Sequence, residues 1–175
     1  MIDYTPLEPT NFLHAKIESI ADDFRKEINF HIGDRIEPLI YRLGGLVKYE
    51  AIDNDNKIAL TVYSKNNFEI SVSAYLGAER FRFWLAHQLG HYVLHSNFGE
   101  KSIIAKNWDG ENLTPEHEAN RFASCFLMPR EDLIKQYNDH FENTHYGAKY
   151  LWQKLCSRYM IQENLLLQRM SKIGL

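Results

Sequence analysis

Two histidines one helical turn apart are the residues of this chain best suited to chemistry. His87 and His91 lie in the segment 81–95, which is apolar nearly all the way round a helical wheel, a pattern typical of a buried helix. Residues four apart on a helix have Cβ atoms about 5 to 6 Å from each other, so both imidazoles can reach one metal ion. Because a buried polar group without a partner costs roughly 1 to 3 kcal/mol, this pair needs either a metal or hydrogen-bond partners.

The residue that follows the first histidine decides what such a metal site can do. Zinc is the metal we expect, because neutral imidazole is a good zinc ligand and a catalytic zinc keeps one position open for water. The metalloprotease motif H-E-x-x-H has a general-base Glu after its first histidine, whereas this chain has Gln88. An amide can hold a water but cannot take its proton. The sequence therefore predicts metal binding with poor hydrolysis.

A third ligand has to come from another segment, and residues 114–129 predict a second helix with one buried stripe. Glu116 and Glu118 flank that stripe on opposite sides, and either can point inward. An acid in the first helical turn is favoured by the helix dipole alone, which explains Glu116 without a metal. Glu118 lies further in and has no equally good explanation of that kind.

The two helices together resemble a known peptidase family. The elements Ala-His-Gln-Leu-Gly-His-Tyr-Val-Leu-His at 86–95, Glu-Ala-Asn-Arg-Phe-Ala at 118–123 and Leu-Met-Pro at 127–129 are similar to those of the ImmA/IrrE zinc metallo-endopeptidases, whose core is gluzincin-like. The resemblance extends from the predicted strands to the C-terminus. It implies zinc bound by His87, His91 and Glu118, with Gln88 at the position of the general base. It also implies a protein substrate, typically a helix-turn-helix transcriptional repressor encoded nearby.

Gln88 departs from the family pattern, and two explanations fit. An inactivating substitution would keep the metal site and stop turnover, while a natural loss would leave a binding protein. We favour the first, because every other part of the site remains. The function expected is therefore a zinc endopeptidase with impaired hydrolysis, and the alternative is a non-catalytic, metal-containing scaffold that binds a partner regulator.

Five further residues are expected to support the site. Tyr92 and His117 are candidates for stabilising the oxyanion of a tetrahedral intermediate. His95 continues the histidine series by one turn, about 6 Å further along the helix axis, so we expect it beside the site or at the helix end rather than on the metal. Asn120 and Arg121 can orient Glu118, as partners of metal ligands generally do.

The elements that must position these residues predict an α+β fold. Runs rich in β-branched and aromatic residues at 46–52, 57–63 and 68–73 predict a small three-stranded antiparallel sheet, and residues 97–112 predict a loop. Helical periodicity predicts further helices at 11–30, 131–141, 147–159 and 162–173. We expect a zincin-like domain at 1–145 and, at 146–175, a C-terminal helical pair that resembles a helix-turn-helix and packs on the core.

Composition limits the remaining functions. The chain has 175 residues, 20 basic and 23 acidic side chains and a formal charge of −3, so direct nucleic-acid binding is disfavoured, even through the sparsely basic C-terminal helices. No run of about 18 apolar residues is available to span a bilayer. Cys125 and Cys156 form no C-x-x-C pair, and we expect both as reduced thiols in a cytoplasmic protein.

Overall fold

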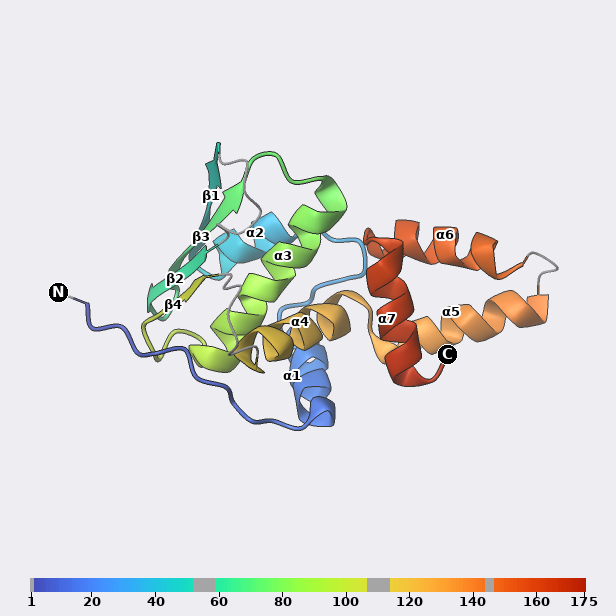
Figure 1. Ribbon diagram of the computed structural model, residues 1–175, viewed down its shortest axis with the longest axis horizontal. Helices are drawn as coiled ribbons and strands as arrows, with labels where there is room; N and C mark the ends of the chain where they lie inside the picture. Colours follow the sequence, from blue (N-terminus) through green and yellow to red (C-terminus); the bar gives the residue numbers. More distant parts are fainter. Residues whose placement is uncertain (1, 52–58, 107–113, 144–146) are drawn as a thin grey trace.

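The computed structural model describes residues 2–51, 59–106, 114–143 and 147–175, and it has the predicted mixed α+β architecture (Figure 1). The strands are β1 (Gly45–Glu50), β2 (Ala59–Ser64), β3 (Asn67–Ser73) and β4 (Ile103–Lys106). The helices are α1 (His14–Glu27), α2 (Ile36–Arg42), α3 (Ala78–Gly90), α4 (Thr114–Leu127), α5 (Arg130–Asn143), α6 (Ala148–Tyr159) and α7 (Glu163–Ile173), and α3 continues directly into the π-helix η2 (His91–His95).

The sheet differs from the predicted three-stranded antiparallel meander in two respects. It has four strands in the order β1-β3-β2-β4, and β1 pairs with β3 in parallel, while β2 is antiparallel to both β3 and β4. A tight turn with Asn66 at φ 56° joins β2 to β3. Because β3 also pairs with β1, it lies between β1 and β2. The fourth strand falls in the predicted loop at 97–112. Strand runs in a sequence show which segments are extended, but not which neighbours they choose.

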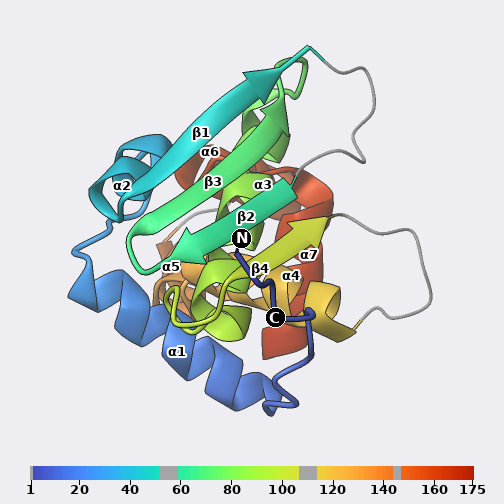
Figure 2. The same ribbon diagram turned by 90° about the vertical axis from the view of Figure 1, so that its left-hand side faces the viewer.

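The helices pack on one face of the sheet, as Figure 2 shows with the four strands in front. Alternate residues of β2 and β3 point to the core, so that Leu60, Val62, Phe68, Ile70 and Val72 are all buried. Burying a side chain of this size contributes roughly 1.5 to 3 kcal/mol. The core therefore fixes the sheet firmly against the helix that carries the two histidines.

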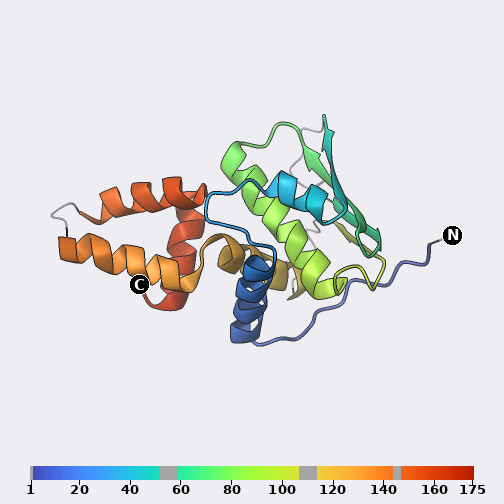
Figure 3. The same ribbon diagram turned by 180° about the vertical axis from the view of Figure 1, so that it is seen from behind.

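Helix α3 is the central helix of the fold. It contacts β3, α2 and α4, and α4 in turn packs on α1; Figure 3 shows this arrangement from behind. Its residues from Leu85 to Gly90 are all buried, as predicted for a helix that is apolar on every side. The polar side chains between Leu85 and Gly90 are consequently held in a buried environment.

The C-terminal helices are tied to the rest of the molecule by buried polar contacts. The Arg169 guanidinium of α7 is 1% exposed, donates to the Met128 carbonyl and pairs with Glu18 of α1. The predicted helical pair corresponds to α6 and α7, whereas the predicted domain boundary falls on residues 144–146, outside the described residues. Among the described helices, none has the length and apolar character that crossing a bilayer requires.

Candidate metal centre

The two motif histidines face each other in the interior. His87 and His91 are 0% and 1% exposed, and their Nε2 atoms lie 3.1 Å apart. Both rings project from the same face of α3 and η2 because the residues are four positions apart. Their burial follows from the apolar neighbours on either side, since the helix between the sheet and α4 has no solvent-facing side at this level.

Glu116 supplies the third potential ligand. One of its carboxylate oxygens lies 3.1 Å from Nε2 of His87 and the other 3.2 Å from Nε2 of His91. One candidate ligand atom from each of the three residues can be chosen so that all lie within 4.8 Å of one another. Two ligands of a tetrahedral zinc ion, each about 2.0 to 2.1 Å from the metal, are separated by about 3.3 Å. The spacing of these donor atoms therefore fits a zinc ion.

A glycine allows α4 to come this close. A Cβ atom at Gly90 would lie 3.1 Å from the Cα and carbonyl oxygen of Ala119 and 3.2 Å from Cβ of Phe122. These contacts are tighter than side chains normally tolerate, so the lack of a side chain at Gly90 lets the two helices approach. The close approach places Glu116, at the start of α4, beside the histidines at the end of α3.

The structure does not place Glu118 where the family resemblance implied. Its carboxylate accepts a hydrogen bond from Nε2 of His95 at 2.9 Å, and from both the backbone N–H and the hydroxyl of Thr10, each at 2.9 Å. Glu116 and Asn120 are four residues apart on α4 and share the face toward His87, whereas Glu118 lies on another side of the helix. Glu116 therefore replaces Glu118 in the group of potential ligands.

Hydrogen bonds fix the orientation of both histidines. Nδ1 of His87 lies 3.0 Å from the Asn120 side-chain oxygen, an acceptor, so this nitrogen carries the proton and Nε2 keeps its lone pair. Nδ1 of His91 lies 3.0 Å from Nδ1 of His95. With Nε2 of His91 free for a metal, Nδ1 of His91 donates to His95 and Nε2 of His95 donates to Glu118, whose carboxylate also accepts from Thr10. Such partners hold a metal ligand in its tautomer and raise its basicity.

A π-helical turn makes the contact between His91 and His95 possible. From His91 to His95 the helix is widened, and the Ser96 amide donates to the His91 carbonyl five residues back. The His91 and His95 ring centroids are 4.9 Å apart, so His95 lies beside His91 as a hydrogen-bond partner. Single π-turns of this kind occur frequently at functional sites.

Gln88 has a buried amide oxygen without a partner. The residue is 1% exposed, and its Oε1 atom makes no hydrogen bond among the described residues. Buried polar atoms are nearly always paired, and an unpaired one calls for an explanation such as a water or an ion. An unpaired oxygen on the residue next to His87 is what a site that holds a metal and its water would leave.

Burial and contact with Glu116 set the protonation of the group. Burial lowers the pKa of His91 to about 3, against the opposing effect of the neighbouring Glu116 carboxylate. Burial alone would raise the pKa of Glu116, but the contact of its carboxylate with the imidazoles of His87 and His91 lowers it below its usual value. Around neutral pH the structure therefore presents a neutral His91 beside an ionised carboxylate, which is the state that binds a divalent metal.

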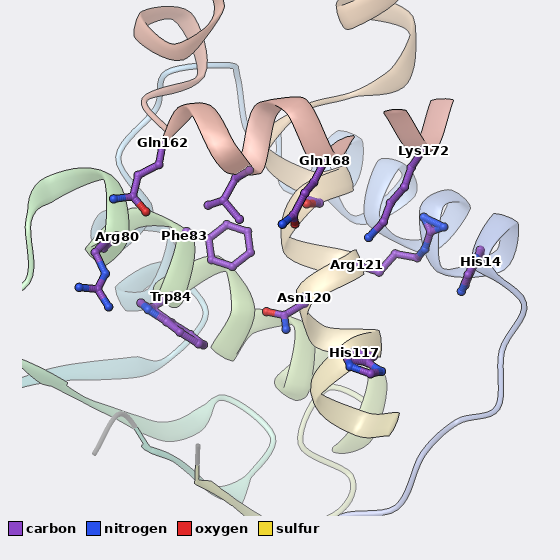
Figure 4. A pocket seen from close by; sticks show the side chains of 12 residues that line it. His14, Arg80, Phe83, Trp84, His117, Asn120, Arg121, Gln162, Gln168 and Lys172 are labelled. Carbon is purple, nitrogen blue, oxygen red and sulfur yellow. The ribbon is translucent and has the colours of Figure 1, made fainter. Parts of the chain in front are cut away.

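Three of the predicted residues, Tyr92, His117 and Arg121, make no hydrogen bond or ion pair with the three potential ligands in the described part of the chain. The Tyr92 hydroxyl donates to the Phe98 carbonyl and its ring stacks on Phe68, so the expected oxyanion role has no geometric support. His117 and Arg121 face a cavity on the outer side of α4 (Figure 4). Arg121 makes no ion pair with Glu118 among the described residues, and Asn120 orients His87 instead of Glu118.

Comparisons with known proteins indicate the family and the fold of this chain. The family model for the peptidase M78, IrrE N-terminal-like domain matches residues 42–171. A solved structure described as a Mycobacterium tuberculosis transcriptional regulator is similar with a TM-score of 0.60 and 18% sequence identity, over 92% of this chain and 47% of that chain. This chain thus spans about half the length of that protein, and the likeness shows the fold. A comparison with curated proteins finds no match. Because the family model covers most of the chain, including both histidines and Glu116, the chain belongs to the IrrE N-terminal-like family of M78 peptidases, which are metal-dependent.

Proposed function

We propose that this chain is a zinc-dependent endopeptidase domain in which His87, His91 and Glu116 hold the metal. The observation that carries the proposal is the convergence of these three side chains, with donor atoms 3.1 to 3.2 Å apart in the interior of the protein. Zinc fits a set of two imidazoles and one carboxylate, and three protein ligands leave a position open for water. When bound, zinc would polarise a scissile carbonyl and lower the pKa of a water molecule.

Gln88 determines what the chain itself can contribute to hydrolysis. Its buried amide can donate to and accept from a water next to His87, so it can orient that water. It cannot accept a proton near neutrality, and general-base catalysis typically contributes about 10² to 10⁴ in rate. We therefore propose that hydrolysis by this chain is slower by about that factor than that of a variant with Glu at position 88.

The substrate we propose is a transcriptional regulator, specifically a helix-turn-helix repressor encoded near this protein. Two observations support a protein substrate of this class. The family is a peptidase family, and one protein of the same fold is described as a transcriptional regulator. The net charge of −3 disfavours direct binding to DNA. Both cysteines are free thiols, in keeping with a proposed cytoplasmic location.

Gln88 also favours a second candidate function. A chain that keeps the metal ligands but lacks the base can serve as a metal-containing scaffold that binds a regulator without cleaving it. In that case the metal would stabilise the fold around His87 and His91, and the partner would remain intact.

Restoring the base separates the two functions. The Gln88→Glu variant, loaded with zinc, is incubated with a helix-turn-helix repressor encoded near the gene, and the products are identified by mass spectrometry. The control carries Gln88→Glu together with His91→Ala. Cleavage by the first variant alone supports the peptidase. Stable binding of the repressor by the Gln88→Glu chain, without fragments from either chain, supports the scaffold and contradicts the peptidase.

A further inference from the structure

A cavity of about 600 Å³ lies between α3, α4 and α7, close to the metal centre. Figure 4 shows Arg80 at one side of it, Arg121, Lys172 and His14 at the other, and Phe83 and Trp84 between them. The volume is within the range of about 300 to 1,000 Å³ typical of binding sites for drug-sized ligands.

The charge of the cavity has one sign. Arg80, Arg121 and Lys172 are basic side chains, and none of the described residues that line the cavity is Asp or Glu. Neither Arg121 nor Lys172 forms an ion pair within the described part of the chain. In a chain whose net charge is −3, a cavity with only basic charges stands apart from the average surface and favours an anionic occupant.

The floor of the cavity is apolar and connects to the metal ligands. The Trp84 ring lies against the His87 ring at 4.8 Å between centroids, and Asn120, which also lines the cavity, holds Nδ1 of His87. Two lining residues thus touch His87 directly. An occupant in contact with Trp84 or Asn120 is separated from His87 by only that side chain.

We infer that this cavity binds an acidic segment of the polypeptide substrate, with carboxylates toward Arg121, Lys172 and Arg80 and an apolar side chain against Trp84. This inference rests on the proposed peptidase function. A peptide fits better than a nucleic acid, because the basic groups surround a concave and partly apolar floor instead of forming an extended basic face. The substrate class is therefore a protein with glutamates or aspartates on both sides of an apolar residue, next to the cleaved bond.

Binding to the chain as it stands tests the cavity without any turnover. The probe is a fluorescein-labelled peptide in which glutamates flank a leucine, and its twin has glutamine in place of each glutamate. We expect the acidic peptide to bind more tightly than its twin, and the Arg121→Gln/Lys172→Gln variant to weaken the acidic peptide about 5- to 30-fold, as two exposed charge pairs of about 0.5 to 1 kcal/mol each imply. The matched control, Arg130→Gln/Lys154→Gln, removes the same charge from α5 and α6, away from the lining residues.

Four results overturn the inference: equal binding of the two peptides, equal weakening by the two double variants, displacement of the peptide by duplex DNA, or binding of inorganic phosphate through Arg121 and Lys172 while neither peptide binds. The proposed peptidase is tested separately with the Gln88→Glu chain. If that chain cleaves a repressor without any preference for acidic peptides, the cavity inference fails and the peptidase stands. If it cleaves nothing while the acidic peptide still binds through Arg121 and Lys172, the cavity binds an acidic peptide and the peptidase fails.

Discussion

Replacing each of the two glutamates of α4 in turn by glutamine distinguishes a metal ligand from a residue that orients one. Glu116→Gln removes the charge that lies 3.1 and 3.2 Å from the two histidine Nε2 atoms. Glu118→Gln removes a charge of the same size, two residues away, from a carboxylate bonded to His95 and Thr10. Both substitutions keep the shape of the side chain, so any difference between them reports the position of the carboxylate.

The structure predicts different magnitudes for the two variants. Partners that orient a metal ligand typically contribute 10- to 100-fold to metal affinity, and Glu118 acts on His91 only through His95. An amide oxygen at position 118 still accepts from His95 and Thr10, so we expect a loss near the lower limit, about 10-fold. Loss of the Glu116 ligand should exceed the upper limit, so we expect more than about 100-fold, or roughly 2.8 kcal/mol.

Zinc affinity is measured by competition with a chromophoric chelator at pH 7, with circular dichroism spectra to confirm that each variant is folded. The expected order of affinity is unsubstituted chain, then Glu118→Gln, then Glu116→Gln. If Glu118→Gln loses more affinity than Glu116→Gln, the assignment of Glu116 as the ligand is refuted, and the family pattern with Glu118 is restored.

Three further predictions concern the surroundings of the site. His91 has a pKa of about 3 in the fold and 6.5 as a free side chain. Below pH 6.5 the unfolded chain therefore binds more protons than the folded chain, and stability is lost as the pH falls toward 3. Between pH 6.5 and 5 the loss in free energy of unfolding amounts to about 2 kcal/mol. Urea unfolding of the metal-free chain should show that loss and His91→Gln should reduce it, whereas identical pH profiles would contradict the burial argument. Thr10→Val removes one of the three donors to Glu118 and leaves the Thr10 backbone N–H and His95. Chelator competition should therefore show zinc affinity falling by up to about 10-fold, with Thr10→Ser as the conservative control. Unchanged affinity in Thr10→Val would argue against the relay through His95. Gly90→Ala should lower stability by about 1 to 3 kcal/mol, because its Cβ meets α4 backbone at 3.1 Å. The control in thermal unfolding is Gly77→Ala, where a Cβ meets nothing within 4 Å. Equal effects of the two substitutions would contradict the close approach of the helices.

The sequence was sufficient to predict the part of the site that lies on one helix. The spacing of His87 and His91 places both on one helical face whatever the rest of the fold does, and the apolar residues around them require that the helix be buried. The structure adds the orientation of the rings, whose Nε2 atoms lie 3.1 Å apart. The α+β class was also predictable, because the segments of β1 to β3 and the helices differ in their hydrophobic period.

Contacts between elements could not be predicted in the same way. The choice between Glu116 and Glu118 depends on which face of α4 packs against α3, and the two helices come close at Gly90. One local signal was present, since Glu116 and Asn120 are four residues apart and share a face. The oxyanion role of Tyr92 stays a prediction, because its ring stacks on Phe68 of the sheet and its hydroxyl donates to the Phe98 carbonyl. Strand β4 was missed because four residues are too few to show a period.

The central claim is that His87, His91 and Glu116 bind one divalent metal ion, and anomalous diffraction from crystals of the zinc-loaded chain tests it most directly. The account predicts a single strong zinc peak about 2.0 to 2.2 Å from Nε2 of both histidines and from a carboxylate oxygen of Glu116. A zinc peak coordinated by His95 and Glu118, or histidines that carry no metal at saturating zinc, would contradict it.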